Sequence, residues 1–566
     1  MTPTVWMMAF LGAGLLWAAM PPLDLWPLAW VATIPWIWLI RCEQLGGRTP
    51  TLPTGPRLRF GLASVAGRLA RRPYLTLGFA GFAFWMGALH WLRLPDPATS
   101  IGWVALSFYF AFYLPAFVSL SRVAVHRLRV PVVLATPVVW TGLELARGRF
   151  LSGMTMGSLC HTQYRWTGLV QVSDLTGAYG VSFVMMLVSA SLARALPLQD
   201  AGGQPSGGRR WIAAAAQLAL AAVVLAAAFG YGHLRMAGNM TDPGPRIALI
   251  QGAIDVKMQY DKDMRPKMFE QYVGLSRRAV DEHRDIDLLV WPESMFPEPL
   301  VTFDGNPLRP ANFEGSDSAF RQWLHDNERR GPSLMGERAR DLGVPLLLGS
   351  DTWHFGAAGS NLYNSAVAVA RDGRLLGRYD KMHLVPFGEY VPFADWWPWL
   401  QRLTPLPISV TPGEKPLAID VHYSGNRVAR IAPNICYETV LPQVIRRQVN
   451  GLAAEGREPD ILINLTNDGW FWGSSELDMH LACGVFRAVE CRKPLLVAAN
   501  TGFSAWIDSD GRILEKGPRR QTGVLVARPG IDHRRSPYLA YGDWPAGICL
   551  AVCALLAAVG LYGRRR

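Results

Sequence analysis

The stretch YDKMHLVPFGE, at residues 379–389, places a lysine ammonium directly before an apolar, turn-rich segment. Two distant stretches have a similar arrangement. WPES, at residues 291–294, carries a glutamate, and NICYE, at residues 434–438, carries a cysteine, each at or near the end of an apolar run. A catalytic thiol needs a base that removes its proton and a cation that favours the thiolate and the oxyanion. We therefore predict one catalytic centre from three stretches, with the reactive residues Glu293, Lys381 and Cys436.

Each of these residues has a simpler interpretation when it is considered alone. A single Cys near a strand end is most often a small buried hydrophobic residue. Glu293 by itself is typical of a solvated loop carboxylate, and Lys381 of a surface cation. The combination favours catalysis, because burial beside Trp291 would raise the pKa of Glu293 toward the range of a general base. A sharp strand-to-helix turn at Cys436 would expose the sulfur.

Three further residues are candidates to support this centre. The apolar surroundings of Lys381 indicate that its ammonium is partly buried, and a buried ammonium needs an anionic neighbour. Glu293, Glu389 or a thiolate could serve, and Glu389, at the end of the same stretch, is the expected partner. Tyr437 and Glu438 directly follow the cysteine. The sequence leaves open whether Glu389 or Glu438 contributes more.

From about residue 246 to residue 535 the composition is that of an ordinary globular domain with alternating strands and helices. Glu293, Cys436 and the pair Asn467-Asp468 follow strand ends, which is where α/β folds build active sites. Residues 271–283 are rich in helix formers. The expected strands are residues 246–251, 286–291, 344–348, 365–370, 428–431, 460–465 and 495–499.

The first 240 residues are apolar and contain Arg in clusters but no Lys. Spans of about 17–25 apolar residues can cross a bilayer as helices. The N-terminus lacks the basic segment of a signal peptide, so we expect its first apolar span to be an uncleaved helix. Eight spans are expected, at residues 4–20, 25–40, 74–92, 101–120, 130–145, 168–192, 211–230 and 544–562.

Arginine placement predicts the orientation of these eight helices. If the N-terminus is cytoplasmic, sixteen Arg residues lie in cytoplasmic segments and four in the outer loops of the bundle. This positive-inside bias places the globular domain in the periplasm or its equivalent. The expected domains are a membrane domain with seven helices at residues 1–240, a periplasmic catalytic domain at 241–540, and a last membrane helix with a basic tail at 541–566.

Charge and cysteine content exclude other classes of function. The net charge of +12 comes largely from Arg between apolar segments, which is typical of membrane topology, so no nucleic-acid partner is expected. The seven Cys form no CxxC pair and no Cys/His metal spacing, so we expect neither a disulfide framework nor a metal.

One helical face carries His480, Cys483, Arg487 and Glu490. We interpret these residues as structural support for the site.

The three stretches resemble the active site of the nitrilase (carbon–nitrogen hydrolase) superfamily, and YDKMHLVPFGE is the most specific of them. With the apolar helices added, the whole chain resembles the bacterial apolipoprotein N-acyltransferase family. The resemblance implies a multi-span α-helical membrane arm of eight helices plus a nitrilase-like α-β-β-α sandwich, in the cytoplasmic membrane. It also implies that Glu293, Lys381 and Cys436 are the catalytic residues. Further matching stretches are IQG (250–252), NDGWF (467–471), NTG (500–502) and GDW (542–544).

The same resemblance implies the reaction and its partners. Cys436 would take an acyl chain from a phospholipid such as phosphatidylethanolamine and pass it to the amine of a diacylated apolipoprotein. A membrane arm suits such substrates, because pulling acyl chains into water costs about 0.8 kcal/mol per CH₂. No cofactor is implied, and a monomer is expected. Two alternatives stay open: a membrane-tethered amidase or nitrilase, and a non-catalytic lipid-binding or transport protein with a decayed hydrolase domain.

Several residues are candidates for substrate contacts. Tyr260 stands where the family has a Trp, and Trp470 and Phe471 are either core aromatics or part of a loop that dips toward lipid. Glu144 and Arg147 either form a helix-end ion pair near the headgroups or contact substrate. The chain departs from the family at residues 152–157 and at residue 472, and these departures concern lipid contacts rather than the triad.

Overall fold

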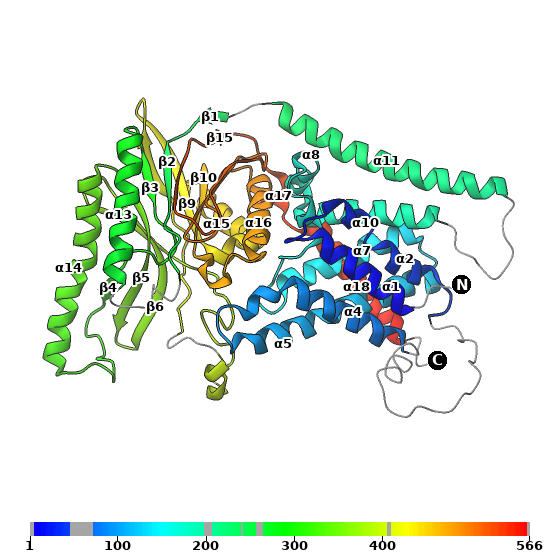
Figure 1. The fold of residues 1–566 in the computed structure, drawn as a ribbon, viewed down its shortest axis with the longest axis horizontal. Helices are drawn as coiled ribbons and strands as arrows, with labels where there is room; N and C mark the ends of the chain where they lie inside the picture. The colour runs from blue at the N-terminus through cyan, green and yellow to red at the C-terminus, as the bar shows by residue number, and fades with distance from the viewer. Residues whose placement is uncertain are drawn as a thin grey trace. The chain divides into compact units, whose positions relative to one another are not determined.

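The computed structural model describes residues 5–45, 72–196, 207–238, 241–255, 264–394, 396–403 and 409–562. The chain divides into two compact units, which are coloured by residue number in Figure 1. The helical unit comprises Met1–Arg93, Ser100–Ala237 and Asp543–Arg566. The sandwich unit comprises Leu94–Thr99 and Gly238–Gly542.

Two β-sheets form the centre of the sandwich unit. The first has the order β14 (Gly523–Ala527), β2 (Ile247–Gln251), β3 (Leu288–Val290), β5 (Leu346–Gly356), β6 (Gly359–Val369) and β7 (Leu375–Asp380), with β4 (Leu300–Phe303) paired to β5. The second has the order β13 (Ile513–Lys516), β12 (Ala505–Ile507), β11 (Leu495–Ala499), β10 (Ile461–Thr466), β9 (Arg427–Ile435) and β8 (Ile419–Tyr423). A separate antiparallel pair joins β1 (Thr241–Pro243) to β15 (Gly530–Asp532).

Parallel pairing in the middle of each sheet requires crossover connections, and helices supply them. In the first sheet β2, β3 and β5 are parallel, and α13 (Arg265–Glu282) and α14 (Asp317–Leu342) lie between these strands in sequence. In the second sheet β9, β10 and β11 are parallel, with α15 (Pro442–Ala454) and α16 (Glu476–Cys491) between them. Figure 1 shows α13 and α14 on one side of the strands and α15 and α16 on the other. The unit is therefore an α-β-β-α sandwich.

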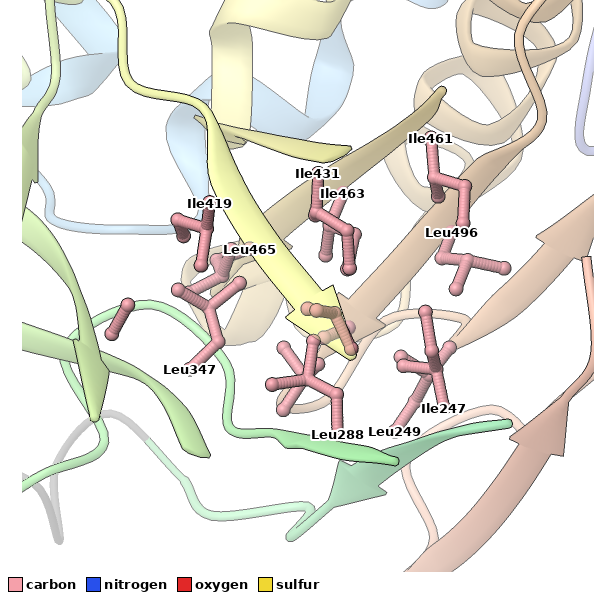
Figure 2. Packing of buried hydrophobic residues seen from close by; sticks show 14 of the residues in the cluster. Ile247, Leu249, Leu288, Leu347, Ile419, Ile431, Ile461, Ile463, Leu465 and Leu496 are labelled. Carbon is pink, nitrogen blue, oxygen red and sulfur yellow. The ribbon is translucent and has the colours of Figure 1, made fainter. Parts of the chain in front are cut away.

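The core of the sandwich follows from the alternation of side chains along each strand. Ile247 and Leu249 of β2 belong to the cluster between the two sheets, whereas Ala248 and Ile250 belong to the cluster beneath α13 and α14. Figure 2 shows residues of the inter-sheet cluster, with Ile463 and Leu496 contributed by the second sheet. Both faces of β2 are covered, which is why its sequence is a continuous apolar run.

The helical unit contains a series of apolar helices. They are α1 (Val5–Ala19), α2 (Ile34–Arg41), α4 (Pro73–Ala88), α5 (Thr99–Ala111), α6 (Tyr113–Arg122), α7 (Val132–Arg149), α8 (Thr167–Val170), α9 (Ser173–Thr176), α10 (Ala178–Ala195), α11 (Gly207–Ala237) and α18 (Trp544–Tyr562). Shorter turns are η1 (Trp26–Trp30), η2 (His90–Arg93), η3 (Val123–Arg127) and η4 (Leu159–Gln163). The sandwich unit adds η5 (Pro398–Leu403) and α17 (Pro537–Tyr541).

Of the eight expected spans, four form helices that are long and apolar enough to cross a membrane within the described residues: Thr99–Arg127, Ala178–Ala195, Trp211–Ala237 and Trp544–Tyr562. The expectation of eight full spans therefore needs correction. Residues 25–40 break into η1 and α2, each of which begins with a Pro in its first turn. Residues 168–192 keep a long apolar helix, but it begins only at Ala178, after Gly177 with φ 70°. The expected spans 74–92 and 130–145 correspond to α4, which has 16 residues, and to α7, which has Pro137 inside it; neither is among the four. Val5–Ala19 is apolar but only 15 residues long.

Candidate active site

The three predicted catalytic residues follow the ends of three strands. Glu293 lies three residues after β3, Lys381 directly follows β7, and Cys436 directly follows β9. The strands β3 and β7 belong to the first sheet and β9 to the second. Packing of the two sheets face to face therefore brings together side chains that are far apart in sequence.

The Lys381 ammonium lies between two carboxylates. Its Nζ donates to Glu389 Oε1 at 2.8 Å and lies 3.6 Å from Glu293 Oε1. The Lys381 side chain is 1% exposed, so both contacts are shielded from water. An ammonium has three N–H donors, so a donor remains for an oxyanion. The expectation that Lys381 has Glu389 as its anionic neighbour agrees with this contact.

Asn364, in the interior of β6, connects these groups. Its Nδ2 donates to Glu293 Oε1 at 2.6 Å and to Glu389 Oε1 at 3.4 Å. Its carbonyl accepts from the Lys381 N–H at 2.8 Å. The second Glu293 oxygen accepts from the backbone N–H of Asn467 at 2.9 Å. Sequence reasoning missed Asn364, because a polar residue within a strand carries no sign of what lies opposite.

Cys436 begins the short helix η6 (Cys436–Val440) with φ 50°, a left-handed conformation that is uncommon outside glycine. Two donors fix this turn through the Cys436 carbonyl, which accepts from Asn464 Nδ2 and from His480 Nε2, each at 3.1 Å. The turn therefore has the sharp strand-to-helix geometry predicted from the sequence, but Cys436 is half-buried rather than exposed. His480 is thus placed as a support of the site, in agreement with its interpretation from the sequence.

Glu438 joins the cysteine turn to the lysine stretch. One oxygen, Oε1, accepts from the N–H groups of Met382 and His383 at 2.8 and 3.0 Å, and Oε2 accepts from the Ile435 N–H at 2.7 Å. The hydroxyl of Tyr379 lies 2.8 Å from both oxygens. Glu438 is fully buried. It therefore positions both segments, whereas Glu389 contacts the ammonium itself.

Burial dominates the pKa shifts of Glu293 and Cys436, two of the three predicted catalytic residues. It raises the pKa of Glu293, and the Lys381 ammonium only partly opposes this. Burial also raises the pKa of the Cys436 thiol well above its ordinary value; the charge of Glu293 raises it further, and Lys381 lowers it. Burial alone would lower the pKa of Lys381, but Glu389 and Glu293 hold it above its ordinary value. The site therefore combines a neutral thiol, a strengthened carboxylate base and a permanent cation.

The other predicted site residues of the sandwich unit are more peripheral. The ring of Tyr437 stacks on His383, with ring centroids 6.3 Å apart. Trp470 and Phe471 are half-buried in η7 (Asp468–Phe471), which directly follows Asn467. Tyr260 lies outside the described residues.

Glu144 and Arg147 belong to α7 of the helical unit, and the helix-end ion pair, one of the two alternatives for these described residues, is not formed. The Arg147 guanidinium donates to the Met156 carbonyl at 2.7 Å and to Ser158 Oγ at 2.8 Å. Its Cζ lies 4.8 Å from the centroid of the Trp85 ring. Glu144 Oε1 accepts from the Leu159 N–H at 2.8 Å. Both side chains therefore bind the segment that follows α7, chiefly through its backbone groups, rather than each other.

Comparisons with known proteins agree with this architecture. A model of the apolipoprotein N-acyltransferase N-terminal domain matches residues 12–191, and the carbon-nitrogen hydrolase model matches residues 246–529. The apolipoprotein N-acyltransferase of Geobacter metallireducens is 31% identical, over 98% of this chain and 95% of its own. That of Rhodopirellula baltica is 29% identical, over 95% and 93%.

Among solved structures, an amidase from Nesterenkonia sp. is similar, with a TM-score of 0.34 and 20% identity over 54% of this chain and 96% of its own. The curated relatives extend over nearly the whole chain, through both the helical and the sandwich units. The chain therefore belongs to the apolipoprotein N-acyltransferase family.

Proposed function

We propose that this protein transfers an acyl chain from a membrane phospholipid to the N-terminal amine of the diacylglyceryl-cysteine of apolipoproteins. The observation that carries the proposal is the match of named apolipoprotein N-acyltransferases over 95% and 98% of the chain, helical unit included. An amidase of the nitrilase superfamily would account for the sandwich unit alone. The geometry around Cys436 supports the chemistry.

The first half-reaction acylates the thiol. Glu293 takes the proton of Cys436, whose sulfur attacks the ester carbonyl of the phospholipid, and Lys381 stabilises the tetrahedral oxyanion. The C–O bond breaks, the lysophospholipid oxygen takes the proton from Glu293, and a thioester remains on Cys436. Because burial raises the pKa of the thiol, proton transfer to Glu293 accompanies attack rather than preceding it.

The second half-reaction transfers the acyl chain to the lipoprotein. The free α-amine attacks the thioester, and Glu293 takes a proton from the nitrogen. The C–S bond breaks, Glu293 gives that proton to the departing thiolate, and an amide is released. The two substrates use the same base, cation and sulfur in turn, which is ping-pong covalent catalysis. No cofactor is required by these steps.

We further propose that the sandwich unit faces the periplasm and that the donor is phosphatidylethanolamine-like. The four apolar helices support a location in the bacterial inner membrane. The excess of Arg in segments assigned to the cytoplasm supports the orientation. A site next to the outer leaflet would let both lipid substrates keep their acyl chains in the bilayer.

Intact-mass analysis tests this function. Full-length protein in phosphatidylethanolamine nanodiscs should gain the mass of one acyl chain on Cys436, and a diacylated lipopeptide should remove it while gaining the same mass. Cys42, which is half-buried in the helical unit, provides a matched control. Cys42→Ala should still be acylated, whereas Cys436→Ala should not.

The same experiment distinguishes the two rival functions. Discharge of the adduct to water, with no gain of mass on the lipopeptide, would indicate a membrane-tethered hydrolase. Full complementation of a strain that lacks the acyltransferase by Cys436→Ser would indicate a non-catalytic protein. Either result would contradict the proposed reaction.

A further inference from the structure

Three buried side chains converge next to the turn that carries Cys436. A carboxylate oxygen of Asp468, a carboxylate oxygen of Glu476 and a ring nitrogen of His480 all lie within 4.8 Å of one another. Asp468 and Glu476 are each 3% exposed and His480 is 6% exposed. Asp468 begins η7, and the other two residues are four positions apart in the first turns of α16, so they share one helical face.

The orientation of the His480 ring directs one nitrogen at the Cys436 carbonyl and the other at Asp468. Its Nε2 lies 3.1 Å from the Cys436 carbonyl, which only accepts, so Nε2 carries the proton. In the neutral ring Nδ1 is then an acceptor, and it lies 3.4 Å from Asp468 Oδ1. An imidazolium bound to a carboxylate would come closer, to about 2.7–2.9 Å. Two ligands held about 2.0–2.1 Å from one tetrahedral ion are about 3.3 Å apart.

The charges of this cluster are not balanced by side chains. Within the described part of the chain, Asp468 and Glu476 form no ion pair with any Lys or Arg; the nearby Arg519 pairs with Asp478. Glu476 Oε2 is buried and has no hydrogen-bond partner among the described residues. The N-terminus of α16 offers only about half a positive charge. Two buried carboxylates at this distance need a cation or a shared proton.

We propose that Asp468, Glu476 and His480 bind a divalent transition-metal ion. The set of two carboxylates and one imidazole fits Zn²⁺ or Mn²⁺ better than Mg²⁺ or Ca²⁺, which prefer oxygen alone. The bond from His480 to the Cys436 carbonyl is the usual second contact of a metal-bound His. Thr466 Oγ1 donates to Asp468 Oδ1 at 2.7 Å and orients that carboxylate in the same way.

The ion would act on the nucleophile turn through His480. Fixing the ring would hold the Cys436 carbonyl, and with it the left-handed backbone of that residue. The ion would also neutralise Asp468, whose charge otherwise raises the pKa of the thiol. The inference goes beyond the acyl transfer proposed above, and it concerns a site that the family resemblance does not imply.

Metal content and thermal stability test this site independently of acyl transfer. Full-length protein without a histidine tag is stripped with a chelator, loaded with ZnCl₂, dialysed and measured by mass spectrometry of the metal. We expect about one Zn²⁺ per chain and a Tm that rises with Zn²⁺, because the ion binds the folded state. Glu476→Gln and His480→Gln should lower the affinity at least about tenfold. Glu455→Gln removes an exposed carboxylate of the sandwich unit and should bind as the natural protein does.

Folding of the key variant does not confound the test. Glu476→Gln removes one of two neighbouring buried charges, so without metal it should melt at or above the natural Tm, and Zn²⁺ should no longer raise it. Retention of less than about a tenth of an equivalent by the natural protein would overturn the proposal, as would equal Zn²⁺ affinity in Glu476→Gln. Loss of binding in Cys436→Ala would also overturn it, since the thiol would then be a required ligand.

Discussion

Replacement of Glu438 by Gln tests whether one buried carboxylate holds the lysine and cysteine segments together. The carboxylate accepts three backbone N–H groups and one hydroxyl, from partners on both sides of the site. An amide keeps the size of the side chain but has a single acceptor oxygen. Its oxygen will stay where the N–H groups of Met382 and His383 converge, so its NH₂ will face the N–H of Ile435.

The cost follows from these contacts. A buried N–H without an acceptor costs about 1–3 kcal/mol, and the remaining bonds weaken because the acceptor is no longer charged, so the total is about 2–4 kcal/mol. For a unit of this size this loss lowers Tm by roughly 5–10 °C. Ile435 directly precedes Cys436, so loss of the acceptor for its N–H will shift the nucleophile. A displacement of the nucleophile by ~1 Å can cost about a hundredfold in rate. We expect Cys436 acylation to slow by about tenfold to a hundredfold.

The assay follows acylation of Cys436 by intact mass in phosphatidylethanolamine nanodiscs, with the Tm of the same samples. Tyr379→Phe is the matched comparison, because it removes one hydroxyl donor and leaves every backbone N–H with its acceptor. It should cost about 1 kcal/mol and slow acylation far less. Glu328→Gln, on the exposed face of α14, should change neither quantity.

Two results would refute this reasoning. Natural Tm and natural acylation in Glu438→Gln would mean that the carboxylate does not bear the contacts described. A lower Tm with an unchanged rate in the folded protein would mean that Glu438 stabilises the domain without positioning the thiol.

Four further predictions concern the ammonium and the groups around it. Glu293 acts as a base only when it is deprotonated, and burial raises its pKa. The rate of acylation should therefore increase with pH, and this increase should occur above the pH range in which an ordinary glutamate titrates. Glu389→Gln should move this increase in rate to lower pH, because the charge of Glu389 helps to raise the pKa of Glu293. An unchanged pH dependence would contradict the assignment of Glu293 as the base. Lys381→Met should reduce the acylation rate by about 10²–10³-fold with little loss of lipid binding, and near-natural rates would exclude it as the oxyanion cation. Asn364→Leu removes the N–H donor to both carboxylates, so it should cost about 1–3 kcal/mol of stability and lower kcat/KM. An unchanged Tm would show that water donates to the carboxylates in place of the amide.

The sandwich strands could be anticipated from the sequence because their signal is local. The apolar run at residues 246–251 forms β2 (Ile247–Gln251), and the run at 460–465 forms β10 (Ile461–Thr466). Both strands are buried on both faces, which makes apolar residues continuous along the chain. The helical unit was harder to anticipate, since apolar composition does not reveal where a helix breaks. The turn at Gly177, and Pro27 and Pro35 in the first turns of η1 and α2, divide segments that composition alone would join.

The sequence by itself singled out Glu293, Lys381 and Cys436 as candidate catalytic residues, since each lies beside an apolar run that neighbouring residues define. Only the tertiary structure decided what surrounds them. Asn364 reaches Glu293 across 71 residues, and the Met382 N–H reaches Glu438 across 56. These bonds exist because two sheets pack face to face, and the register of that packing depends on side chains throughout both sheets, so no local pattern encodes it.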